Sequence, residues 1–142
     1  MNQTLSLLTE CCTGCKYGTN NLEQMRRYTK NEGLSDLIST YNRKHVAYGD
    51  TLHEQLRALG GREEDPKPMA KAMAKLTNSV KLSVNPDTPH VAKLLFDGCA
   101  MGVESLAKYR NRYRDASPEA KEMAADLIKI EMDMMEDLLT YL

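Results

Sequence analysis

The chain has 142 residues, enough for one domain with an ordinary hydrophobic core that needs no disulfide or metal to hold it together. Its 19 basic and 20 acidic residues leave a net charge of −1 and form no long block of one sign, which argues against nucleic acid or a membrane surface as a partner. Helix-forming residues dominate the composition, which includes 9 methionines. We find no alternating strand pattern. We therefore expect an all-α protein.

The first ten residues, MNQTLSLLTE, contain neither the basic segment and apolar run of a signal peptide nor a membrane span. We therefore expect a cytoplasmic protein. Because the cytoplasm keeps thiols reduced, the 4 cysteines are predicted to be free.

Hydrophobic spacing and cap signals predict four long helices and one short one. They cover about residues 4–28, 34–59, 66–82, 88–113 and 117–141. Short connections join the long helices in pairs, so each pair is expected to form an antiparallel hairpin. The segment between Gly60 and Thr88 holds the short helix and is long enough to cross the length of a bundle. This predicts a single domain, 1–142, with the fold of a ferritin-like four-helix bundle: two antiparallel hairpins joined by a long crossover.

Cap residues indicate where the helices begin and end. Thr4, Thr88 and Ser117 are the expected N-caps of the first, third and fourth long helices, and proline follows the last two. Gly33 is the expected left-handed residue that ends the first helix, and the Leu-Gly-Gly at 59–61 is expected to end the second.

The chain resembles an uncharacterised bacterial branch of the ferritin-like four-helix-bundle superfamily, and the resemblance covers nearly its whole length. It rests on the two hairpins, the LRALGG end of the second helix, the crossover with its own short helix, and the spacing from Cys11 to Gly14. In members that bind two iron or manganese ions, the resemblance would imply a Glu on the first and third long helices and a Glu-x-x-His on the second and fourth.

Only part of that ligand set is present at mid-bundle depth. Glu104 matches the carboxylate of the third helix, Glu131 on the fourth has no His three residues later, and His45 stands where the second helix needs Glu-x-x-His. Lys16 and Tyr17 stand near the position where the first helix needs its Glu. A dinuclear site needs more carboxylates than these, so we expect no cofactor; a bound one would be divalent Fe, Mn or Zn.

The cysteines of the first helix allow three interpretations. Cys12 and Cys15 share one face at i, i+3, so their thiolates could converge on a tetrahedral metal ion. We favour packing, because free cysteines are commonly buried as small hydrophobic residues. With Cys11, which lies beside the hydrophobic seam, they could also form a thiol redox sensor. Cys99 is expected to line the core or an interface.

Glycines interrupt the predicted helices, and each one costs a helix interior roughly 1 kcal/mol relative to Ala. The five are Gly14, Gly18, Gly49, Gly98 and Gly102. Close helix packing is one explanation, and a mid-bundle cavity for a small-molecule ligand is the other. His45 is expected to point inward, and a structural hydrogen bond to a tyrosine or to Glu104 is its simpler role.

Methionines crowd the fourth long helix, at positions 123, 132, 134 and 135, and one inward stripe cannot accommodate them all. They predict a homodimer built on that helix. The leading prediction is a non-catalytic binding or structural protein that lacks a complete dinuclear metal site. The alternative is a metal-binding protein or metal-dependent oxidoreductase with an atypical site at His45, Glu104 and Glu131.

Overall fold

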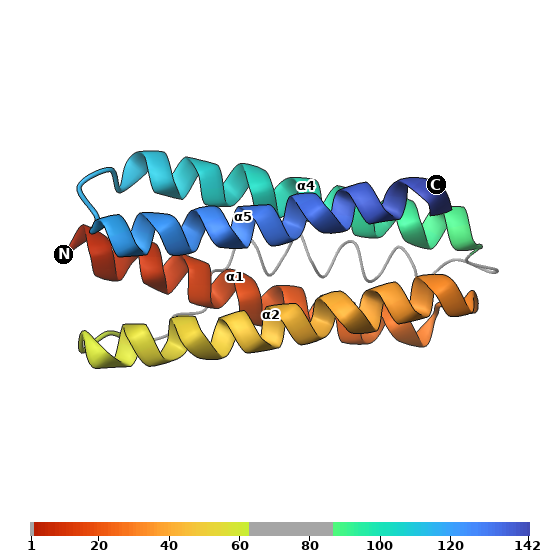
Figure 1. Ribbon diagram of the computed structural model, residues 1–142, viewed down its shortest axis with the longest axis horizontal. Helices are drawn as coiled ribbons and strands as arrows, with labels where there is room; N and C mark the ends of the chain where they lie inside the picture. Colours follow the sequence, from red (N-terminus) through yellow and green to blue (C-terminus); the bar gives the residue numbers. More distant parts are fainter. Residues whose placement is uncertain (1, 63–86) are drawn as a thin grey trace.

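A computed structural model describes residues 2–62 and 87–142. In this part of the chain four long α-helices form a bundle, without strands (Figure 1). They are α1 (Gln3–Arg27), α2 (Glu32–Ala58), α4 (Thr88–Arg112) and α5 (Pro118–Leu138), and α5 continues into the short 3-10 helix η1 (Leu139–Tyr141). The all-α prediction is thereby confirmed. The short helix expected at 66–82 lies outside the described residues.

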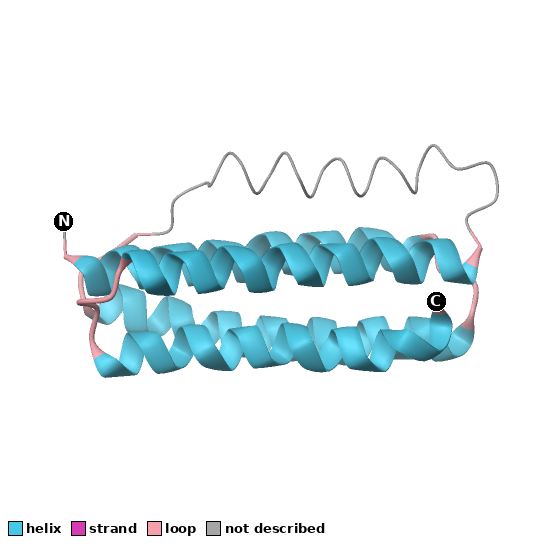
Figure 2. Ribbon diagram, turned by 90° about the horizontal axis from the view of Figure 1, so that it is seen from above, coloured by secondary structure: helices cyan, strands magenta, loops and turns pink. Residues whose placement is uncertain are grey.

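The helices pair as two antiparallel hairpins, α1 with α2 and α4 with α5 (Figure 2). Contacts of α1 with α4 and α5, and of α2 with α5, hold the hairpins together. The start of α1 lies beside the α4–α5 loop, because the backbone N–H of Asp115 donates to Gln3 Oε1 at 2.8 Å and that of Ser117 donates to Thr4 Oγ1 at 2.8 Å. Consequently α2 ends and α4 begins at opposite ends of the bundle (Figure 1). None of the helices in 2–62 and 87–142 is long and apolar enough to cross a membrane.

Each of these helices has a side-chain N-cap. The caps are Asn2, Asn31, Asp87 and Ser117, which accept backbone N–H groups at 2.8, 3.0, 2.9 and 3.2 Å respectively. The prediction for Ser117 is confirmed. Those for Thr4 and Thr88 are wrong, because Asn2 and Asp87 stand just before them and Asn and Asp cap helices better than Thr.

Gly33 does not end α1, contrary to the prediction. The C-cap of α1 is Tyr28, and Asn31 already starts α2, so Gly33 lies in the first turn of that helix. Among the described residues only Gly60 has a left-handed backbone, with φ 79°, and it ends α2 as predicted. Gly33 instead lies close to the end of the chain: an added Cβ would be 2.5 Å from the hydroxyl oxygen of Tyr141.

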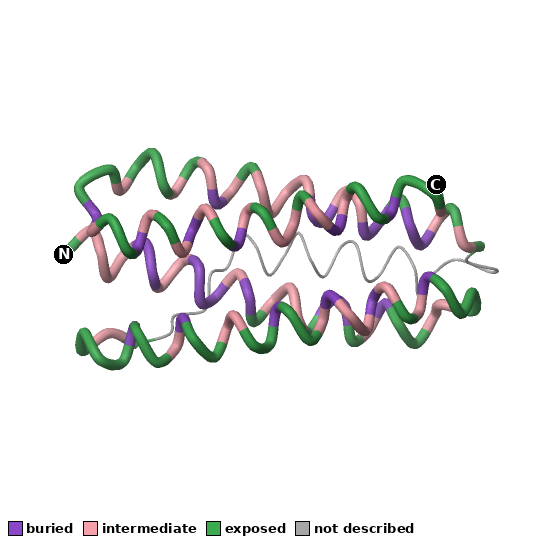
Figure 3. Tube along the Cα trace, viewed as in Figure 1, coloured by how far each residue is buried: buried purple, intermediate pink, exposed green. Residues whose placement is uncertain are grey.

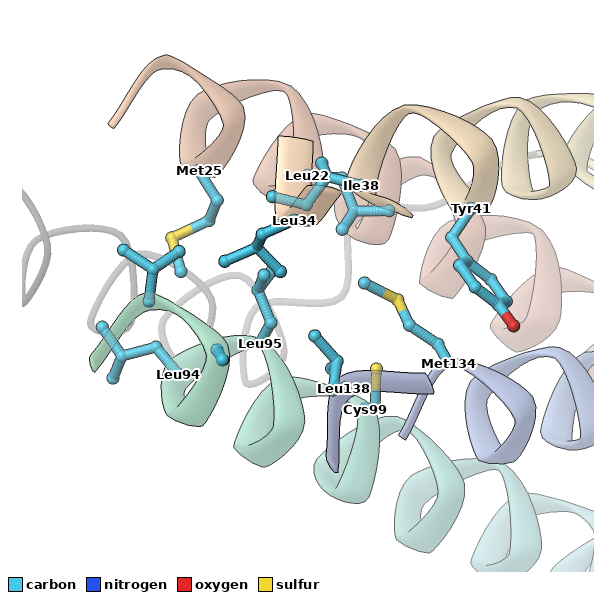
Figure 4. Packing of buried hydrophobic residues seen from close by; sticks show 12 residues of the cluster. Leu22, Met25, Leu34, Ile38, Tyr41, Leu94, Leu95, Cys99, Met134 and Leu138 are labelled. Atoms are coloured by element: carbon cyan, nitrogen blue, oxygen red, sulfur yellow. The ribbon is translucent and has the colours of Figure 1, made fainter. Parts of the chain in front are cut away.

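The core consists of two hydrophobic clusters, one in each half of the bundle. Buried positions recur along the helices from one end to the other (Figure 3). The half that contains the α1–α2 loop is filled by residues such as Leu22, Met25, Leu34, Ile38, Leu95, Met134 and Leu138 (Figure 4). The other half is filled by residues such as Leu7, Leu8, Cys12, Leu52, Leu56, Leu106 and Leu127. Each fully buried Leu or Met stabilises the fold by about 1.5–3 kcal/mol relative to exposure, so these clusters supply most of the driving force.

Candidate functional site

A buried ion pair crosses the bundle between the two hydrophobic clusters. His45 occupies an inward position of α2, and Glu131 occupies an inward position of α5 between Leu127 and Met134. His45 Nε2 and Glu131 Oε1 form a short hydrogen bond, and the two side chains are only 3% and 14% exposed. The pair therefore connects the two hairpins through the interior.

The hydrogen bonds of His45 determine where its protons lie. Nδ1 is 2.7 Å from the backbone carbonyl oxygen of Tyr41. Because a carbonyl only accepts, Nδ1 carries a hydrogen, and this assigns the tautomer. An ionised carboxylate also only accepts, so one further proton lies between Nε2 and Glu131 Oε1. The two groups are either imidazolium with carboxylate or imidazole with carboxylic acid.

Electrostatics favour the charged form of His45. Burial alone would lower the pKa of His45, but the hydrogen bond to Glu131, the charge of Glu131 and the hydrogen bond to the Tyr41 carbonyl together raise it above its usual value. This favours imidazolium with carboxylate, the form in which the two charges neutralise each other in the core.

Two tyrosines flank His45 on α2, and both reach carboxylates on α5. Tyr41 Oη donates to Asp137 Oδ2 at 2.6 Å, and Tyr48 Oη donates to Asp126 Oδ2 at 3.0 Å. Burial, followed by the hydrogen bond to the carboxylate, raises the pKa of each phenol, so both stay protonated donors in neutral solution. With the His45–Glu131 pair, they form a ladder of three rungs that sets the antiparallel register of α2 against α5.

Two thiols adjoin the middle rung. Cys99 of α4 donates its S–H to Glu131, and burial, the charge of Glu131 and this hydrogen bond all raise the pKa of Cys99. Cys15 of α1 borders the same cavity, and burial, with the charges of Cys11 and Glu131, raises its pKa as well. All four helices of the bundle thus contribute a side chain to this layer.

A small cavity of about 40 Å³ adjoins the His45–Glu131 pair. Its lining includes the glycines Gly14, Gly18, Gly98 and Gly102. An added Cβ at Gly18 would lie 3.6 Å from His45 Cδ2, and one at Gly102 would lie 3.6 Å from Glu131 Oε2. These are ordinary van der Waals distances, so the missing methyl groups account for part of the space. The cavity exceeds the roughly 10–15 Å³ that one water needs and is far below the 300 Å³ or so of a typical ligand pocket.

Glu104 lies apart from the other two predicted ligands. Its side chain is 66% exposed and accepts a hydrogen bond from Lys108 Nζ at 2.7 Å, and this hydrogen bond lowers the pKa of Glu104. His45 does bond to a tyrosine, through the Tyr41 backbone, but its carboxylate partner is Glu131. Within the described residues, no group of three or more His, Cys, Asp or Glu side chains is arranged to hold a metal ion.

The cysteines lie in the core, as the packing interpretation predicts. Cys12 and Cys15 are each 3% exposed, and none of the four cysteines forms a disulfide. Cys11, expected beside the seam, is itself fully buried, and burial, with the charge of Glu10, raises the pKa of its thiol to about 12. Cys99 is also buried.

No protein-family model, no curated protein and no solved structure matches the chain.

Proposed function

We propose that the chain is a non-catalytic binding or structural protein of the ferritin-like type, in which a proton bridge between His45 and Glu131 replaces a metal as the link between helices. The observation that carries this proposal is the internal satisfaction of the pair. Both ring nitrogens of His45 have partners, and Glu131 accepts from His45 and from Cys99. A buried polar group with all its partners present rigidifies and specifies a core.

The ladder between α2 and α5 supports the same role. Three hydrogen bonds from successive inward turns of α2 end on three carboxylates of α5. A slip of either helix by one turn would separate the buried His45 from Glu131, which costs about 1–3 kcal/mol for each group left without a partner. It would also break the two tyrosine hydrogen bonds, whose aspartates are exposed. The ladder therefore favours one register over the alternatives that hydrophobic seams alone would allow.

One observation favours metal binding as a second candidate function. A metal-ligating His commonly donates its other ring N–H to a backbone carbonyl, and His45 Nδ1 does so to Tyr41. A divalent ion could displace the proton between Nε2 and Glu131, with thiols of Cys15 or Cys99 as further donors, and its binding would release protons.

The thiol redox sensor has less support. Sensor cysteines need an accessible thiolate, whereas burial raises the pKa of Cys11, Cys15 and Cys99.

Elemental analysis of tag-free protein, before and after incubation with Fe²⁺, Mn²⁺ or Zn²⁺, tests the proposal. We expect no stoichiometric metal in the wild type. Metal that is bound by the wild type and lost in both His45→Gln and Glu131→Gln would overturn the proposal in favour of the second candidate. Glu104→Gln is the matched control, since it makes the same carboxylate-to-amide change at an exposed position of α4.

A further inference from the structure

The face of the bundle formed by the outer sides of α4 and α5 carries an apolar groove of about 720 Å³. We call it the outer α4–α5 face. Its apolar residues are Phe96, Ala100 and Val103 on α4 and Ala125, Ile128, Met132, Met135 and Leu139 on α5 and its extension. Met132 and Leu139 are each 55% exposed, so the groove presents large hydrophobic side chains to solvent. Contiguous exposed apolar groups of this kind mark an interaction site more often than scattered ones do.

The spacing along α5 explains why this face exists. The inner side of α5 buries Ala120, Ala124, Leu127, Met134 and Leu138 in the bundle. The outer residues 125, 128, 132, 135 and 139 repeat at intervals of three and four, which is the pattern of two helices packed along a seam. One such seam suffices for a helix that packs on one side only. The second seam therefore predicts another helix on the outer side.

We propose that the outer α4–α5 face is a homodimer interface, in which α5 packs antiparallel against α5 of a second copy about a two-fold axis near Met132. A two-fold axis places residues at equal distances on either side of it opposite each other. Ala125 then faces Leu139 of the second copy, so that a small residue meets a large one at both ends of the seam. Met132 meets its own copy at the centre, where a flexible thioether adapts well to the contact.

The charges along the seam also match their own copy. Lys129 and Glu136 both line the groove, and each follows a seam residue by one position. In the same antiparallel arrangement Lys129 lies three residues before the axis and Glu136 of the second copy four residues beyond it, so the two are offset by one residue, about 1.5 Å along the helix, which their long side chains can span. Lys129 also contacts Asp133 within its own chain at 2.8 Å, and the Lys93–Asp97 and Lys108–Glu104 pairs are likewise neutralised within the chain. Of the charged residues that line the groove, this leaves Glu136, so the face carries only a small negative charge, which suits a like surface better than a strongly charged partner.

This inference deepens the proposed function by naming a partner, and the two can fail separately. The proposed function depends on metal content and on the buried pair, whereas the dimer depends on the residues of the outer α4–α5 face. A monomer without metal would overturn only the dimer, and a dimer that binds metal through His45 would overturn only the proposed function.

Sedimentation equilibrium of the full chain tests whether the face is used. We expect a wild-type dimer whose dissociation constant rises at least about tenfold in Met132→Glu, since a central contact residue carries much of the binding energy. Val46→Glu is the matched control, because Val46 is 44% exposed on α2, outside this face. Circular dichroism verifies that both variants are folded. A wild type that stays monomeric, or a dimer that Met132→Glu leaves unchanged, would overturn the proposal.

Two charge reversals test the register. Lys129→Glu places Glu opposite Glu on both sides of the two-fold axis, and Glu136→Lys places Lys opposite Lys, so each variant alone is expected to dissociate. In a mixture, each acidic side chain at positions 129 and 136 of one variant faces a basic side chain of the other, so the two variants are expected to form a heterodimer. Because mixing changes nothing within either chain, dimers that appear only in the mixture show contact between copies. A mixture as monomeric as its components would contradict the antiparallel arrangement.

Discussion

Glu131 on α5 meets His45 on α2 in the layer that separates the two hydrophobic clusters of the core. The shared proton makes each group the partner that keeps the other satisfied. Removal of one group should therefore lower the free energy of unfolding more than removal of both.

We expect His45→Leu and Glu131→Leu each to lower the free energy of unfolding by about 3–5 kcal/mol, because each leaves one buried polar or charged group unpaired. The double variant His45→Leu/Glu131→Leu should lose less than the sum of the two, since apolar side chains replace the whole pair. Urea denaturation measures all three. Additive losses would show that the two residues do not act as a pair.

The raised pKa of His45 makes stability depend on pH. Its pKa in the folded state lies above the unfolded value of 6.5, so the contribution of the charged pair is complete below that pH and is lost as the pH rises through the folded-state pKa. In that window the free energy of unfolding should fall by up to about 1.4 kcal/mol per pH unit. Denaturation curves at a series of pH values measure this slope. His45→Gln should flatten it, whereas His90→Gln, at the start of α4, should leave it in place; an unchanged slope in His45→Gln would assign it to other groups.

Alanine at the cavity glycines should stabilise the bundle. Gly18→Ala and Gly102→Ala each add a methyl group at 3.6 Å from its nearest neighbour on the far helix and improve helix propensity, so we expect a gain of about 1 kcal/mol for each. Gly60→Ala is the contrasting control, because its φ of 79° suits glycine and should make the same substitution cost about 1–2 kcal/mol. Thermal unfolding distinguishes the two signs. A loss of stability in Gly102→Ala would mean that the cavity has to stay open for the fold itself.

The four thiols should react slowly in the native state. Burial raises the pKa of Cys11 to about 12, which leaves a thiolate fraction on the order of 10⁻⁴ at pH 8. Labelling with a chromogenic disulfide reagent should therefore become fast only in denaturant. A single thiol that reacts rapidly without denaturant would revive the redox sensor, and Cys→Ser variants would identify it.

Much of the fold follows from helical periodicity. The observed ends of α1, α2 and α4 lie within two residues of the predicted ones, because glycines, prolines and polar caps interrupt the hydrophobic spacing clearly. The last three residues of the fourth predicted helix form η1 instead of α-helix. The caps themselves were less predictable, since Asn2 and Asp87 compete with the neighbouring threonines for the same role.

The candidate site depends on helix rotation, which depth along the bundle does not reveal. Glu104 and Glu131 lie in similar layers, but Glu104 follows Gly102 by two residues and is turned by about 200° from it. Gly102 faces Glu131, so Glu104 points to solvent. The hydrophobic spacing along α5 predicts the inward position of Glu131 better than depth does. Glu131 lies four residues after Leu127 and three before Met134, both of which are buried. The pairing of Glu131 with His45 depends both on the order of the helices in the bundle and on the rotation of each helix about its axis.

The mid-bundle cavity has a consequence under hydrostatic pressure. Unfolding eliminates internal voids, so the cavity of about 40 Å³ contributes to the volume decrease that favours unfolding under pressure. The cavity adjoins the His45–Glu131 pair at the middle of the bundle, between the two hydrophobic clusters. Compression should therefore open this bundle from its middle, although heat and denaturant usually fray helices from their ends.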